Sequence, residues 1–290
     1  MKILIIGRNG QVSRELQLAL ADQAELLILG QDQLNLATST NIRERVESLG
    51  PDLIINAAAH TAVDQAESEP DRAFAINAIA PGLLAEAAAR LGVPLIHYST
   101  DYVFAGDKSS SPYTEDDAPA PLTVYGQSKL AGEEAIRAVG GQHLILRTSW
   151  VYSLHGKNFL LTMQRLLQER DELRVVADQI GAPTWAGTIA RTTAELITHW
   201  QAGRAGPWGT YHLSGLGETS WFGFAEAIAA QLRQQDKPCG RLEAIPSSAY
   251  PTPAQRPLNS RLDCSRLQRD WSVHLPDWHA ALLECLSSPR

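Results

Sequence analysis

The chain has 290 residues, of which 44% are hydrophobic, so it is long enough to bury one large core or two smaller ones. Its formal net charge is −7, from 25 basic and 32 acidic side chains, with no basic run or stripe, which excludes nucleic acid as the expected partner. No stretch approaches the roughly 20 apolar residues that a membrane span needs, so we expect no membrane partner either.

The three cysteines, Cys239, Cys264 and Cys285, are far apart and odd in number. They form neither a CxxC pair nor a metal-site spacing, so we expect reduced, buried thiols. Only four apolar residues precede the first glycine, which is too short a run for a secretory signal. These features predict a soluble, cytoplasmic protein.

Short apolar runs alternate with segments of helical spacing through the first half of the chain. We predict strands at 2–7, 25–30, 52–58, 94–100 and 143–149, and helices at 11–21, 38–49, 70–91 and 123–139. Buried parallel strands are continuously apolar, as the runs ILII and LII are. The alternation predicts an α/β fold with a Rossmann-like, doubly wound parallel sheet that helices cover on both faces.

Beyond residue 151 the pattern is less regular. Helices are predicted at 158–169, 186–200 and near 220–235, with a strand at 173–177. A proline-rich segment, 245–257, cannot be a central strand or helix and is expected to be an ordered loop over a site, or else a plain surface loop. We therefore divide the chain into a dinucleotide-binding domain, 1–150, and a smaller α/β substrate domain, 151–290, with later segments free to cross back.

The first predicted strand runs directly into the sequence GRNGQVS, residues 7–13. Glycines at a strand-to-helix turn let backbone N–H groups approach a pyrophosphate, which then lies at the positive end of the helix. The alternative is a tight turn that binds nothing. The candidate cofactor residues in this loop are Gly7, Arg8, Gly10, Gln11 and Val12.

The end of the second strand usually carries an acidic residue that holds the coenzyme ribose. Gly30 stands there instead, with Asp32 two positions later, while Arg8 can pair with a 2′-phosphate. We therefore expect NADPH, with NADH as the alternative. Further expected cofactor contacts are Asn35 and Leu36 at the adenine, and Ala59, His60 and Thr61 beside the nicotinamide ribose.

A hydroxyl, a phenol and an ammonium group are expected to meet at the carboxyl edge of the sheet. Thr100 ends the fourth strand, and Tyr125 and Lys129 are one turn apart on one face of the following helix. An isolated YxxxK is most often an ordinary surface pair. Beside a nicotinamide, however, this set forms a carbonyl-reduction site, in which Lys129 lowers the pKa of Tyr125 from about 10 toward neutrality.

Seven segments together resemble the extended short-chain dehydrogenase/reductase superfamily and, within it, the dTDP-4-dehydrorhamnose reductase family. They are GRNGQV, NAAAHTAVDQAESEP, YSTDYVF, VYGQSKLAGE, RTSWVY, DQIGAPT and SAYPTPAQRPLNSRLD. The resemblance extends in order from residue 2 to about residue 284, which is nearly the whole chain. It implies NADPH- or NADH-dependent reduction of a dTDP-sugar, dTDP-4-dehydro-β-L-rhamnose, at C4, and it allows a homodimer.

The resemblance also implies roles for individual residues. Tyr125 is the proton donor, Lys129 its partner and a ligand of the nicotinamide ribose, and Thr100 a hydrogen-bond donor to the substrate carbonyl. Asp101 and Trp150 belong to the sugar site. Arg256, in the proline-rich loop with Asn259, serves the diphosphate.

Three positions depart from the family pattern. Ser13 replaces a third glycine and Gly30 an acidic ribose ligand. Gly187 replaces a glutamate that some members use, with two others matched by Glu15 and Glu284, to bind magnesium between subunits. We therefore expect no metal site, although the resemblance leaves Mg²⁺ as an alternative.

Two other functions remain open at this level. One is a nucleotide-sugar dehydratase or epimerase of the same superfamily, although dehydratases follow the threonine with Asp-Glu and here Asp101-Tyr102 follows Thr100. The other is a non-catalytic regulatory subunit that binds a dinucleotide, against which the complete set of Thr100, Tyr125 and Lys129 argues.

Overall fold

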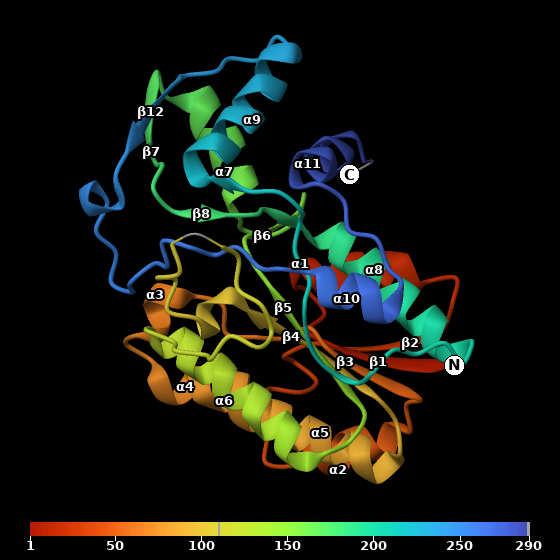
Figure 1. Ribbon diagram of the computed structural model, residues 1–290. Helices are drawn as coiled ribbons and strands as arrows, with labels where there is room; N and C mark the ends of the chain where they lie inside the picture. The colour runs from red at the N-terminus through yellow and green to blue at the C-terminus, as the bar shows by residue number, and fades with distance from the viewer. Residues whose placement is uncertain (110, 289–290) are drawn as a thin grey trace.

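The computed structural model describes residues 1–109 and 111–288, and a six-stranded parallel sheet lies at its centre (Figure 1). The strands in spatial order are β10 (Gly209–His212), β5 (His143–Thr148), β4 (Leu95–Thr100), β3 (Leu53–Asn56), β1 (Lys2–Ile6) and β2 (Glu25–Leu29). Strand order reverses between β1 and β3, which creates the crevice where open α/β sheets bind ligands. The predicted α/β class is confirmed.

Helices cover both faces of this sheet. Ile3 and Ile5 of β1 pack toward one face and Leu4 toward the other, because successive side chains of a strand alternate. The first face is covered by α1 (Gln11–Leu20), α8 (Ala186–Gln201) and α10 (Ser265–Trp271), and the second by α2 (Ile42–Leu49), α5 (Ala80–Leu91) and α6 (Val124–Val139). The sheet is thus doubly wound.

A smaller α/β region lies beyond the carboxyl edge of the sheet, at the top of Figure 1. It contains α7 (Phe159–Glu169), α9 (Trp221–Gln234) and α11 (Trp278–Ser287), with β7 (Glu172–Val176) paired to β12 (Arg241–Ile245). Two further short pairs join β6 (Val151–Tyr152) to β9 (Thr184–Trp185) and β8 (Ile180–Gly181) to β11 (Thr219–Ser220). A separate core that includes Leu160, Phe224 and Leu282 holds this region together.

After residue 150, where the first predicted domain ends, the chain returns to the central layer. β10 pairs in parallel with β5, and α8 packs on α1. Residues on both sides of position 150 therefore build the central layer. Helices α10 and α11 were not predicted; α10 has only 7 residues, too few to show a clear period.

The predicted helix at 70–91 is interrupted. It consists of α4 (Pro70–Phe74), a π-helical turn η1 (Ala75–Ile79) and α5. The predicted helix at 38–49 likewise begins only at Ile42. A π-turn shifts the helix register, and here it turns the buried side chain of Asn77 toward the sheet edge.

The expectation that no stretch is long and apolar enough to cross a membrane is wrong. Within the described residues, Pro70–Leu91 passes that test by length and composition, with a mean hydropathy of 1.2. Its α5 segment packs against both α2 and α6, and 44% of the apolar window is buried. Packing within the fold accounts for its composition.

Close approach of α6 to η1 gives a stability prediction. A Cβ atom at Gly132 would overlap the carbonyl oxygen of Asn77, so the backbones would have to separate. Gly132→Ala should lower the free energy of unfolding by about 1–3 kcal/mol in denaturant titrations, as overpacking does. Gly141→Ala is the control, because its Cβ would meet Ala89 at an ordinary 3.5 Å. Equal stability of the two variants would contradict this packing.

Candidate functional site

The glycine loop lies at the point where strand order reverses. Gly7 has a φ of +109°, and a Cβ there would lie 2.9 Å from the backbone nitrogen of Ala58, so only glycine fits. Helix α1 follows with Gly10 at its N-cap and no side-chain cap. Its first N–H groups therefore face the crevice without a side-chain acceptor, an arrangement that suits a pyrophosphate.

Two adjoining clefts, of about 360 and about 600 Å³, open at this edge and share Gly7, Ala59 and Thr61. The smaller cleft adds the predicted adenine contacts and His60. The larger cleft adds the rest of the glycine loop and most of the predicted reaction site. The predicted residues along the larger cleft are Arg8, Gly10, Gln11, Val12, Thr100, Asp101, Tyr125, Lys129 and Trp150, and those along the smaller one are Asn35, Leu36 and His60.

The backbone of His60 is fixed by the π-turn. The side-chain oxygen of Asn77 accepts from the His60 N–H at 2.8 Å, and its nitrogen donates to the His60 carbonyl at 3.0 Å. The same nitrogen donates to the Ser128 hydroxyl on α6. The π-turn thus ties the segment after β3 to the helix that carries Tyr125.

Arg8 reaches over Gly30 rather than out of the loop. Its guanidinium donates to Asp32 at 3.2 Å and to the amide oxygen of Gln33. A Cβ on Gly30 would lie 2.5 Å from Asp32, so the missing side chain makes room for this pair. Arg8 and Asp32 are 37% and 67% exposed, so both remain accessible to a ligand.

Tyr125 is the second residue of helix α6, whose N-cap Thr123 accepts a hydrogen bond from the Gly126 N–H. The phenol is buried beside Tyr102, with ring centroids 5.4 Å apart. Burial raises the pKa of Tyr125 well above its ordinary value, and the nearby Thr100 hydroxyl acts in the opposite direction. The predicted lowering of this pKa toward neutrality by Lys129 is therefore wrong for this structure, because desolvation dominates.

The Lys129 amine points into the sheet edge. It donates to the Tyr98 carbonyl at 2.7 Å and lies 3.1 Å from Nε2 of His97, and the side chain is 1% exposed. Burial lowers the pKa of Lys129 to about 8, and the negative charge of Glu133 partly opposes that shift.

At the end of β4, Thr100 caps the short 3₁₀ helix η2 (Asp101–Val103). Its hydroxyl accepts from the Tyr102 N–H at 3.2 Å and donates to Asp101 at 3.1 Å. Burial raises the pKa of Asp101 to about 6, while the nearby hydroxyl groups of Ser260 and Thr100 act in the opposite direction. Its Oδ2 atom is buried with no hydrogen-bond partner within residues 1–109 and 111–288, so it is free to bind a hydroxyl group.

On the far side of the larger cleft, Trp150 stacks on Trp221 with ring centroids 3.7 Å apart and planes 14° from parallel. Trp150 has a φ of +48°, a strained conformation for a bulky residue that costs about 1–3 kcal/mol. Gly181 permits it, because a Cβ there would lie 2.7 Å from the indole. Such strain in a cleft wall is typical of ligand sites.

Residues along the larger cleft that were not predicted include Trp221, Lys157 and Asn158. Asn158 caps α7 and donates to the side-chain oxygen of Gln11 at 2.7 Å, so it joins the glycine loop to the second region. An N-cap asparagine is visible in sequence, but its cross-domain contact is not.

Arg256 is not among the residues lining either cleft. Its Nη2 pairs at 2.6 Å with Asp64 of the short helix α3 (Val63–Ala66), which also accepts from the Ala254 N–H. Asp64 thus fastens the proline-rich loop, which includes the 3₁₀ turn η3 (Ser247–Ala249). Asn259 has a structural role, since its amide nitrogen donates to the Lys108 carbonyl at 2.6 Å.

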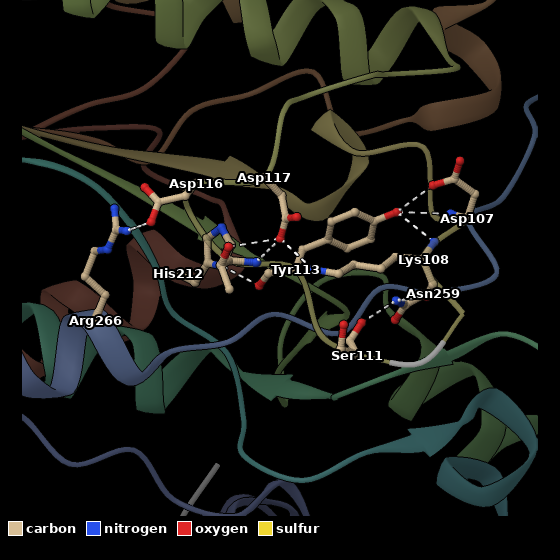
Figure 2. Close-up of polar contacts among 10 residues, drawn as sticks. Asp107, Lys108, Ser111, Tyr113, Asp116, Asp117, His212, Asn259 and Arg266 are labelled. Atoms are coloured by element: carbon tan, nitrogen blue, oxygen red, sulfur yellow. Dashed lines mark hydrogen bonds and ion pairs between the residues drawn. The ribbon is translucent and has the colours of Figure 1, made fainter.

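The loop that leads from Thr100 to Tyr125 is braced by polar contacts. Figure 2 shows Tyr113 reaching across the loop, where its hydroxyl donates to the Asp107 carboxylate at 3.0 Å and accepts from the Lys108 N–H. Lys108 pairs with Asp117 at 2.8 Å, and Nδ1 of His212 on β10 donates to the Tyr113 carbonyl. These contacts hold Asp107, Tyr113 and Asp117 of this loop in place.

Comparison with known proteins agrees with this geometry. The family profile described as the RmlD substrate binding domain matches residues 1–290. A dTDP-4-dehydrorhamnose reductase from Burkholderia thailandensis is 47% identical over 99% of this chain and 98% of its own length. Crystal structures of dTDP-4-dehydrorhamnose reductases from Clostridium acetobutylicum and, with NADP, from Bacillus anthracis are each 35% identical with a TM-score of 0.90, and they cover 99% and 98% of this chain and 98% of their own. The chain therefore belongs to the dTDP-4-dehydrorhamnose reductase family of the extended short-chain dehydrogenases/reductases.

Proposed function

We propose that this chain reduces the C4 keto group of dTDP-4-dehydro-β-L-rhamnose to give dTDP-L-rhamnose. One observation carries the proposal: Thr100, Tyr125 and Lys129 line a single cleft with the glycine loop. The 47% identity to a reductase over almost the whole chain supports the same substrate. The reaction is an NAD(P)H-dependent step of dTDP-rhamnose biosynthesis.

A nicotinamide coenzyme supplies the hydride when it is bound, and the chain fits such a group. Gly7 leaves the crevice clear of side chains, and the first turn of α1 offers N–H groups without a side-chain cap. Arg8, Asn35 and Leu36 would hold the adenosine half. Ala59, His60, Thr61 and Lys129 would hold the nicotinamide half.

Tyr125 supplies the proton. Its raised pKa keeps the phenol protonated at neutral pH, as a general acid for reduction must be. On substrate binding the Thr100 hydroxyl turns its one proton from Asp101 to the carbonyl oxygen. The ammonium form of Lys129 stabilises the negative charge that develops there. In this site, therefore, Lys129 acts through its charge and position rather than by ionising the phenol beforehand.

The sugar is assigned to residues of the larger cleft, and the diphosphate to an arginine beside Tyr102 of that cleft. Trp150 offers an aromatic face to the C–H face of a deoxysugar, and Asp101 offers its unpaired oxygen to a sugar hydroxyl. Arg256 is proposed for the diphosphate: one nitrogen is held by Asp64, and Nη1 has no partner in the described part of the chain. We also propose a homodimer in the cytoplasm, where the three free cysteines stay reduced.

The proton-donor role is tested by Tyr125→Phe, which keeps the ring and removes the proton. With dTDP-4-dehydrorhamnose, kcat should fall about 100-fold or more, the scale of a lost general acid, while the KM for coenzyme changes little. The assay is coenzyme oxidation with a panel of dTDP- and UDP-4-keto sugars, of which the wild type should prefer the dTDP substrate.

Tyr211→Phe is the matched control, because its hydroxyl is bonded to the Pro207 carbonyl away from the cleft. A Tyr125→Phe variant with more than a tenth of wild-type turnover, at rate-limiting chemistry, would refute the assignment. No coenzyme oxidation by the wild type with any 4-keto sugar would instead favour the regulatory subunit.

Coenzyme choice rests on Arg8. We propose NADPH, because Gly30 removes the usual acidic ribose ligand and Arg8 is exposed enough to meet a 2′-phosphate. Arg8→Ala should raise the KM for NADPH about tenfold, equivalent to about 1.4 kcal/mol, and leave NADH almost unchanged. Arg14→Ala removes an exposed arginine from helix α1, which follows the glycine loop, and serves as the control. Equal losses for both coenzymes would mean that Arg8 does not recognise the phosphate.

The magnesium site of some family members does not fit this chain. Glu284 is bound by Arg191 through two contacts of 2.6 and 3.0 Å, and burial raises the pKa of Glu15. A Cβ on Gly187 would overlap the Trp185 ring, so a glutamate would not fit there. Within the described residues, no three acidic, histidine or cysteine side chains are grouped to hold a metal.

We therefore predict that magnesium is not needed. The Arg191 guanidinium already supplies the positive charge between these carboxylates, so EDTA should change neither turnover nor the elution volume in gel filtration. Dissociation together with inactivation on chelation, both reversed by Mg²⁺ alone, would show that two carboxylates suffice.

A further inference from the structure

The catalytic lysine has a buried histidine behind it. Nε2 of His97, on β4, lies 3.1 Å from the Lys129 amine, and both side chains are 1% exposed. His97 does not line either cleft, so it acts on the reaction only through Lys129.

The other side of the His97 ring is fixed by Asn56 at the end of β3. The Ala58 N–H donates to Oδ1 of Asn56 at 3.2 Å, which turns the amide nitrogen toward Nδ1 of His97 at 3.0 Å. An amide nitrogen only donates, so Nδ1 must accept. The single proton of a neutral ring is then on Nε2 and faces the lysine.

The ring is neutral at working pH. Burial lowers the pKa of His97 well below its usual value, and the charge of Lys129 lowers it further. An Nε2–H group aimed at an amine is a good partner for the lone pair of the neutral amine and a poor one for an ammonium. The Tyr98 carbonyl accepts an N–H in either state.

Other groups around Lys129 also affect the balance between its ammonium and neutral forms. Glu133, one turn further along α6, favours the ammonium, but it is paired with Arg147 of β5 at 2.6 Å. Tyr98 of β4 and Tyr125 of α6 have raised pKa values and stay uncharged at neutral pH. On η2, Tyr102 is likewise neutral, and Asp101 favours the ammonium only above its own pKa of about 6.

We propose that His97, oriented by Asn56, is a positioning residue for Lys129: the ring fixes the place of the amine and favours its neutral form. This inference rests on the role proposed above for Lys129. With a lysine pKa of about 8, the ammonium is present below that pH and is lost above it. The kcat/KM for reduction should therefore fall on the alkaline side with a midpoint near pH 8.

The tautomer can be read directly in the full-length protein. Long-range ¹H–¹⁵N correlation spectra identify which nitrogen of His97 carries the proton, with assignment by loss of the signal in His97→Gln. We expect a neutral ring protonated at Nε2 from pH 6 to 9. Asn56→Asp places an acceptor against the ring and should move the proton to Nδ1. A wild-type ring protonated at Nδ1, or doubly protonated, would overturn the proposal.

A second measurement follows Lys129 itself. In His97→Gln the neutral amide can turn its oxygen toward the ammonium and stabilise it. Two midpoints should therefore rise by about one pH unit or more: that of the pH titration of the Lys129 Cε chemical shift, and that of the alkaline decrease in kcat/KM. His143→Gln is the control, because it removes a histidine at the start of β5 whose Nδ1 faces the Gly141 carbonyl outside both clefts, and it should leave both midpoints unchanged.

The outcomes separate a positioning role from a structural one. A His97→Gln protein that is less stable but keeps both midpoints would overturn the inference, because His97 would then only fill space. Neither NMR measurement needs substrate, so both test the inference even if the protein does not reduce the 4-keto sugar. A lack of reduction would refute the proposed function and not the role of His97.

Discussion

A buried ion pair between helix α6 and strand β5 is the contact on which the reactive groups depend. Arg147 donates to both carboxylate oxygens of Glu133, at 2.8 and 2.6 Å, and Ser99 of β4 adds a third hydrogen bond. Removing one partner of such a pair typically costs about 3–5 kcal/mol, because the other charge is left buried alone. Glu133 shares a helix face with Tyr125 and Lys129, so the pair also sets where both side chains meet the cleft.

The cofactor side depends on how closely backbones approach one another. Gly7 lets the first loop touch the backbone of Ala57 and Ala58, just after β3, and Gly132 lets α6 touch the π-turn at Asn77. Asn77 in turn holds the backbone of His60. Small residues and one π-turn thus bring the segment after β3, the glycine loop and the Tyr125 helix to one crevice without a side chain in the way.

The substrate side is built differently, from aromatic and charged contacts between regions. The Trp150–Trp221 stack joins the end of β5 to the start of α9, and the Asp64–Arg256 pair joins α3 to the proline-rich loop. Both contacts link a segment of the central layer to the smaller region. The substrate side therefore depends more than the glycine loop does on the contacts that hold the central layer and the smaller region together.

The sequence alone determined the strand–helix alternation, the glycine turn and the YxxxK face, because each depends on neighbours within a few residues. It therefore predicted the α/β class, confirmed here, and it grouped most of the residues proposed for the cofactor, which line two adjoining clefts. Only the tertiary structure decided what surrounds them. Desolvation raises the pKa of Tyr125 where the local pattern predicted a decrease, and Arg256 turns to Asp64, 192 positions away in sequence. Burial and long-range pairing depend on residues that are far apart in the sequence, so local periodicity cannot predict them.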